Sequence, residues 1–280
     1  MSDNNGILNH LKDKAKAKVD EIPAEALIIR GVWRVEYAIN LAPDLEPPIH
    51  NLGYVIVQTV NQGCSYYENE EDPSISEKFI GKNVLDFPTS YRCFDIAGLD
   101  AVFAHLIHKP DNSYVIKGTN IQKAISRAEI VVDESLLALE KCKPKKGNKY
   151  VVVNVGVVGQ FLECLSHRDN LILKASDYYK EIVNRQIHGI KVEYGSFTND
   201  LIANADLAII TGMTLSNNTL DGILDVAKRN NTKVAMFAET GAHFAEECCQ
   251  FGIDVVISEP LPFYLTGPGP TSINIYRKWR

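Results

Sequence analysis

The polar residues best suited to bind a ligand follow a short apolar run at 208–210. They stand before apolar residues spaced three and four positions apart, which is typical of a buried strand leading into an amphipathic helix. One or two side chains among Ser216, Asn217 and Asn218 are enough to cap such a helix. Thr211, Thr214 and the remaining asparagine are then surplus hydrogen-bonding groups. Beside a helix N-terminus, they suit a carboxylate, phosphate or hydroxyl-rich ligand. We assign to this cofactor-binding turn Thr211, Gly212, Met213, Thr214 and Asn217.

A second candidate site begins at Asn154, where the sequence reads N-x-G-x-x-G after a strand-like run. This is the dinucleotide fingerprint with its first glycine replaced, and it can bring backbone close to a ligand. Asp177 follows at the expected end of the next strand, where an acidic side chain commonly meets a ribose. The alternative is a tight strand-to-helix turn without a ligand. The residues assigned to an adenosine-type site are Asn154, Gly156, Gly159, Gln160 and Asp177.

A third strand end, near residue 238, carries Glu239 and Thr240. A glutamate there can hold an ammonium group or a cation, and we assign both residues to substrate binding; a solvated helix cap is the alternative. His243 precedes Cys248 and Cys249 by five and six positions. Only one of these cysteines can share a helix face with the histidine, and structural zinc needs ligand pairs at tight spacing. We therefore expect no metal site.

The composition excludes several classes of function. The formal net charge of −6 leaves no basic stripe for nucleic acid. No apolar stretch reaches the roughly 18 residues of a membrane span, and the six cysteines lack C-x-x-C spacing. We expect a cytoplasmic protein whose partner is a small molecule, with neither nucleic acid nor a membrane. P-loop, G-x-S-x-G and H-E-x-x-H motifs are absent, so catalytic residues cannot be named.

The order of expected elements predicts an α/β protein with two domains, divided at residues 143 and 144. In 144–280, strands are expected at 150–154, 171–175, 190–194, 206–210, 233–237 and 253–257. Expected helices are 160–166, 178–186, 198–204, 218–229 and 242–251. Such alternation favours a Rossmann-like, mostly parallel sheet.

Residues 1–143 read as a smaller α+β domain. We expect a helix over 5–20, strands at 31–41 and 52–60, a helix at 94–107 and one or two helices over 119–140. The tail contains a further strand whose place in the sheet is open.

The segments 208–228, 151–161 and 251–259 together resemble the family described as "putative heavy-metal chelation". The resemblance is most specific at Thr211, Gly212, Asn217, Thr219 and Leu220, and it departs at 238–241. It implies a Rossmann-like domain joined to a domain that resembles the enolase N-terminal domain. The segment 87–106 resembles the family's serine-, arginine- and alanine-rich stretch, and within it we assign Tyr91 and Arg92 to substrate binding.

The first of three functional hypotheses is a small-molecule enzyme, such as a transferase, with an adenosine-bearing cofactor on the C-terminal domain and substrate in the inter-domain cleft. S-adenosylmethionine fits better than NAD, because an incomplete glycine fingerprint is a poorer cradle for pyrophosphate. The second is a non-enzymatic protein that binds a divalent metal or a metal chelate, as the resemblance suggests. The third is a structural homodimer, which leaves the polar strand ends unexplained.

Overall fold

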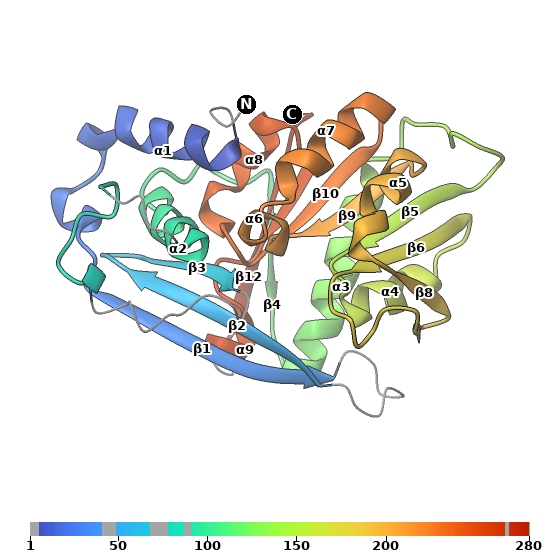
Figure 1. Cartoon of the computed structure of the whole chain (residues 1–280), viewed down its shortest axis with the longest axis horizontal. Helices are drawn as coiled ribbons and strands as arrows, with labels where there is room; N and C mark the ends of the chain where they lie inside the picture. The colour runs from blue at the N-terminus through green and yellow to red at the C-terminus, as the bar shows by residue number, and fades with distance from the viewer. Residues whose placement is uncertain (1–5, 41–48, 68–77, 87–90, 267–268, 280) are drawn as a thin grey trace.

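The computed structural model describes residues 6–40, 49–67, 78–86, 91–266 and 269–279 (Figure 1). It is a mixed α/β structure that contains a small antiparallel sheet and a large, mostly parallel sheet. The expected fold class is therefore confirmed. In the described part of the chain, no helix is long and apolar enough to cross a membrane.

The small sheet is built from the N-terminal part of the chain. Its strands β1 (Gly31–Asn40), β2 (Ile49–Gln58) and β3 (Gln62–Tyr67) are antiparallel in that order. The helix α2 (Arg92–Phe103) packs on β3 and β2, and α1 (Ile7–Ala17) contacts α2. Apolar side chains of these elements form the local core, since α2 is buried along nearly its whole length. The connection from α1 to β1 includes the 3₁₀ turns η1 (Val19–Glu21) and η2 (Ala24–Leu27).

The large sheet runs across the middle of the molecule, with the strand order β4-β12-β11-β10-β9-β5-β6-β8-β7 among the described residues. Its six central strands are parallel: β5 (Tyr150–Val155), β6 (Leu171–Asp177), β8 (Ile190–Tyr194), β9 (Leu207–Thr211), β10 (Lys233–Ala238) and β11 (Val255–Ser258). Antiparallel strands extend both edges: β4 (Asn112–Ile116), β12 (Thr271–Arg277) and β7 (Gln186–Ile187).

Helices cover both faces of the large sheet, which explains why its central strands are apolar on both sides. On one face, α3 (Asn120–Leu137) and α4 (Gly159–Ser166) share an apolar core with the sheet. On the other lie α5 (Thr198–Ala203), α7 (Leu220–Asn230) and α8 (Ala245–Phe251). Shorter turns are α6 (Met213–Ser216), α9 (Phe263–Thr266), η4 (Gly195–Phe197) and η5 (Ala242–Phe244).

Most expected elements of 144–280 are present, but the helix predicted at 178–186 is wrong. That segment forms turns and leads into β7. The carboxylate of Asp177 accepts the backbone N–H of Tyr179 at 2.8 Å, and Asn184 has a left-handed φ of 64°. Both features favour a turn over a continuous helix.

Two long-range features of the sheet were not expected from the sequence. The tail strand β12 lies between β11 and β4, so it joins the end of the chain to a segment that precedes residue 143. The helix α3, also from before residue 143, packs on this sheet as a single helix. The large sheet layer thus includes residues from both sides of the expected boundary.

Candidate functional site

The crevice beyond β5 and β9 is where the strand order of the large sheet reverses. From β5 the chain proceeds outward through β6 and β8, and it then returns to β9 on the other side of β5. The loops that follow β5 and β9 therefore leave the sheet in opposite directions. In open α/β sheets, ligands bind at this position.

A cavity of about 1130 Å³ opens at this crevice and is lined by residues of both sheets. The small sheet contributes Tyr37, Ala38, Leu52, Tyr54 and Tyr66. Loops after strands of the large sheet and the first turns of α3, α4 and α7 form the remaining walls. A cavity of this size admits an organic ligand the size of a nucleoside or larger.

Ten of the residues assigned from sequence line this cavity. They are Gly156, Gln160, Asp177, Thr211, Gly212, Met213, Thr214, Asn217, Glu239 and Thr240. Asn154, Gly159, Tyr91 and Arg92 do not appear in the described lining. Of these, Arg92 donates from Nε to the carbonyl of Leu215 at 2.6 Å, which ties α2 to α6.

Gly156 and Thr211 lie against each other in the lining of the cavity. Gly156 has a φ of +75°, and a Cβ placed there would lie 2.5 Å from Thr211 Oγ1. The Thr211 side chain is buried, with 6% of the residue exposed, and its hydroxyl makes no hydrogen bond to any described residue. A buried hydroxyl without a partner is costly, so a ligand that bonds to it is favoured at this point.

We expect Gly156→Ala to lower the free energy of unfolding by about 1–2 kcal/mol, the cost of a left-handed backbone for a residue with a Cβ, plus the contact with Thr211. Gly147→Ala is the matched control, because Gly147 has a φ of +70° and open space around it. Urea unfolding of both variants separates the two effects. Equal losses would mean that the contact with Thr211 contributes nothing.

Several polar groups of the turn after β9 form hydrogen bonds within the turn itself. The hydroxyl of Thr214 donates to the carbonyl of Thr211 at 2.8 Å. Asn217 accepts the backbone N–H and the hydroxyl of Thr219 through Oδ1, at 3.2 and 2.7 Å. The helix cap expected at 216–218 is wrong: Thr219 is the N-cap residue of α7, and its side chain does not cap. The chain instead forms α6 first and then reverses at Asn218, whose φ is 60°.

The turn after β5 is held by two side chains of the adenosine-type set. Asp177 accepts the backbone N–H of Val157 through Oδ2, at 2.7 Å, and its Oδ1 accepts the N–H of Tyr179. Asn154 is fully buried, donates to the carbonyl of Ile209 and accepts from the N–H of Val158. Both side chains shape the loop that carries Gly156. The contact of Asp177 with a ribose stays a prediction.

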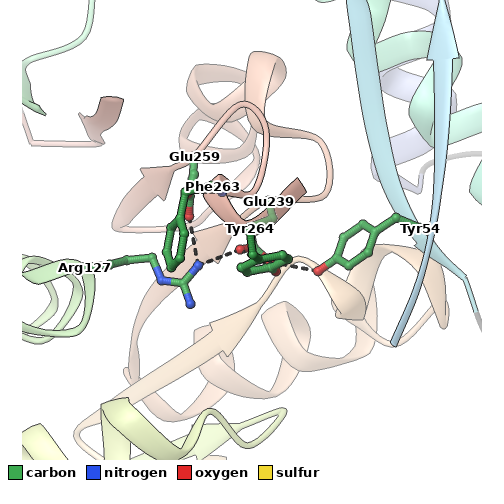
Figure 2. Close-up of polar contacts among 6 residues, drawn as sticks. All are labelled: Tyr54, Arg127, Glu239, Glu259, Phe263 and Tyr264. Atoms are coloured by element: carbon green, nitrogen blue, oxygen red, sulfur yellow. Dashed lines mark hydrogen bonds and ion pairs between the residues drawn. The ribbon is translucent and has the colours of Figure 1, made fainter. Parts of the chain in front are cut away.

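The same cavity holds a buried arginine shared by two glutamates (Figure 2). Arg127 comes from α3, while Glu239 and Glu259 directly follow β10 and β11. Nη1 of Arg127 donates to Glu239 at 2.7 Å and to Glu259 at 3.0 Å. The hydroxyls of Tyr54 and Tyr264 also donate to Glu239, at 2.8 and 2.9 Å. Glu239 was assigned from sequence; the other four were not.

Burial sets the protonation states in this cluster. It raises the pKa of Glu259 to about 7; Arg127 opposes that rise, and the negative charge of Glu239 adds to it. Burial, followed by the charge of Glu239, also raises the pKa values of Tyr54 and Tyr264 well above the ordinary tyrosine range. Both phenols therefore remain protonated donors at neutral pH.

The described residues offer a poor donor set for a bare metal ion. They contain no group of three or more His, Cys, Asp and Glu side chains placed to bind one. Glu239, which lines the cavity, and the fully buried Glu259 are both paired with Arg127. The Cys64 thiol is fully buried, and burial, followed by the charges of Asp100 and Glu239, raises its pKa. His243 pairs with Asp100, from which its Nδ1 lies 3.3 Å away.

A family model and two solved structures point to one family. Residues 146–258 match the model of the family DUF364, described as "putative heavy-metal chelation". No curated protein shows significant sequence similarity to this chain.

Two solved structures of that family resemble the whole chain. Both are described as proteins of unknown function. One, from Desulfitobacterium hafniense, is 11% identical with a TM-score of 0.55, and the match covers 94% of this chain and 98% of that one. The other, from Pyrococcus horikoshii, is 13% identical with a TM-score of 0.56, covering 91% and 88%. At these identities the likeness shows a shared fold. Residues 146–258 thus match the DUF364 family model, as the resemblance at 208–228 implied, and the chain shares the fold of these two structures.

Proposed function

We propose that this protein binds a small organic molecule in the cavity between the two sheets. The observation that carries the proposal is the buried, unpartnered hydroxyl of Thr211, which lies beside Gly156 at the reversal of strand order. A hydroxyl in this position is satisfied when a ligand atom takes the place of the missing partner. Its neighbours Gly156 and Gly212 line the cavity with bare backbone.

An anionic group of the ligand fits the start of α7. Asn218, Thr219 and Gly222 line the cavity there, and the first backbone N–H groups of a helix attract negative charge. The side-chain nitrogen of Asn217 makes no hydrogen bond to the described residues and is a further donor. Glu239, which lines the same cavity, suits a cationic or hydroxyl group.

An adenosyl compound is the more specific form of this proposal. Its adenosine would lie over Gly156, with the ribose near Asp177, and its carboxylate would approach the turn after β9. The sulfonium of S-adenosylmethionine would then approach the Glu239 carboxylate, and an enzyme that uses this cofactor is the corresponding activity. NAD is the second adenosine-bearing candidate.

A metal bound within an organic chelate is the second candidate function. The family description favours metal, while the described residues lack a donor set for a bare ion. An organic chelator supplies those donors itself, so the protein needs only to bind the organic part. The cavity volume of about 1130 Å³ leaves room for such a complex.

Thr211→Val tests the proposal, because it replaces the hydroxyl by a methyl group of similar shape. The free protein is expected to gain about 1 kcal/mol of stability, since a buried unpartnered hydroxyl is removed. Any ligand that forms a hydrogen bond to this hydroxyl should lose about 1 kcal/mol or more of binding free energy in the variant. The measurement is the melting temperature with and without S-adenosylmethionine, S-adenosylhomocysteine, NAD, citrate and nickel citrate.

Thr232→Val is the matched control. Its hydroxyl is also buried, but it donates within the protein, with carbonyls of Ile202 and Ala205 at 2.8 and 3.0 Å. This variant should melt at a lower temperature than the wild type. The rise in its melting temperature on adding ligand should match that of the wild type. The proposal is wrong if every compound that stabilises the wild type stabilises Thr211→Val equally.

A further inference from the structure

Only some of the hydrogen-bond donors of the Arg127 guanidinium are paired with described residues. Nη1 serves both Glu239 and Glu259. Nε is buried and makes no hydrogen bond to any described residue. Figure 2 shows the remaining nitrogen, Nη2, pointing away from both carboxylates. The edge formed by Nε and Nη2 is the one that binds an oxyanion with two parallel hydrogen bonds.

Aromatic rings hold this edge in a fixed orientation. The guanidinium carbon lies 5.0 Å from the ring centre of Phe237 and 4.9 Å from that of Phe263. Together with the two bonds at Nη1, these contacts fix both the plane of the group and its rotation within the plane. A guanidinium that is already oriented loses little conformational freedom when it binds an anion. Arg127, Phe237 and Phe263 all line the cavity.

We propose that the Nε–Nη2 edge of Arg127 is a subsite for a carboxylate group of the cavity ligand. This inference rests on the proposed function and names the chemical class of the ligand. The start of α7 and Thr211 line the same cavity and would form a second anion-binding region. Two such regions favour a compound with two or more carboxylates, the groups from which many organic metal chelators are built.

Charge balance at this subsite requires a proton on Glu259. The groups that face Glu259 are Arg127 from α3, Glu239 after β10 and the backbone N–H of Phe263 in α9. Tyr54 and Tyr264 donate to Glu239 and stay neutral. One guanidinium therefore meets two carboxylates, and a third beside it raises the pKa of Glu259 further above about 7. Binding of the ligand should thus take up a proton from solvent.

Isothermal titration with citrate and, separately, inorganic phosphate tests the subsite. Arg127→Lys keeps the charge but removes the two-pronged edge, so citrate should bind about tenfold more weakly or worse. Glu259→Gln removes a nearby negative charge, so citrate should bind more tightly than to wild type. Arg168→Lys is the matched control, because Arg168 forms an exposed pair with Asp133. It should leave citrate affinity unchanged. Phosphate that binds more tightly than citrate would overturn the assignment to carboxylate.

A second measurement uses wild-type protein and does not depend on how Arg127→Lys folds. Titration of citrate at pH 7.5 in two buffers of different ionisation enthalpy gives the number of protons taken up. We expect net uptake in the wild type and a clear reduction in Glu259→Gln. Citrate that binds without proton uptake, or that fails to bind the wild type, would overturn the inference. The proposed function stands separately, since an adenosyl compound that loses its effect in Thr211→Val would support it in either case.

Discussion

Arg127→Met is expected to lower the free energy of unfolding by about 3–5 kcal/mol, the usual cost of removing one partner from a buried ion pair. The side chain of Arg127 is 9% exposed, and those of Glu239 and Glu259 are 11% and 0% exposed. Methionine fills much of the space between Phe237 and Phe263 but leaves both carboxylates without their cation. Urea unfolding at pH 7.5 measures the loss.

The charge explanation is separated from lost packing by combining substitutions. In Arg127→Met with Glu239→Gln and Glu259→Gln, no buried charge remains unpaired, so much of the stability should return. Arg168→Met is the surface control; its partner Asp133 is exposed, and a change within about 1 kcal/mol is expected. If the triple variant is no more stable than Arg127→Met, packing rather than charge accounts for the effect.

Asp100→Ala is expected to cost about 3 kcal/mol and to loosen the contact between the two sheet units. Asp100 lies in α2 and is fully buried. Its carboxylate accepts the backbone N–H of Cys64 at 2.9 Å and that of His243 at 2.7 Å. Alanine leaves both buried N–H groups without a partner and also removes the charge that faces the His243 ring. Thermal unfolding measures the total loss.

The contribution of the His243 imidazole to stability, through its pairing with Asp100, depends on pH. Burial lowers the pKa of His243, but the charge and hydrogen bonds of Asp100 outweigh burial and raise that pKa above its ordinary value of 6.5. The folded state thus holds the proton more tightly, and the stabilisation is fully present below about pH 6.5. It is lost as pH rises through the folded-state value. His243→Gln should remove this pH-dependent part and leave the two backbone contacts. An unchanged pH dependence in His243→Gln would contradict the assignment.

The position of the candidate site was predictable from sequence because it depends on local signals. The apolar run at 208–210 and the glycines after it mark a strand end, and the carboxyl ends of parallel strands share one edge of a sheet. Gly156, Thr211 and Glu239 therefore line one cavity although they come from the ends of three separate strands. Their individual roles were less predictable, since Asn217 and Asp177 bond mainly to their own loops.

Arg127 was not predicted because its role depends on distant contacts. It lies in a helix 112 positions before Glu239 and 132 before Glu259, and nothing in the surrounding sequence marks it as buried beside them. The pairing of β4 with β12 was equally difficult to predict, because more than 150 residues separate the two strands. In 178–186, the alternation of strands and helices suggested a helix, but the Asp177 contact and the left-handed backbone of Asn184 favour turns instead.

Hydrogen–deuterium exchange on the wild-type protein tests the central claim most directly, with and without whichever compound of the panel raises the melting temperature most. Binding between the sheets should slow exchange together in three segments that line the cavity: 155–160, 211–222 and 52–54. The last of these lies in the small sheet, so its protection shows that the ligand touches both units. Protection confined to one sheet, or to residues outside the cavity, would contradict a site between them.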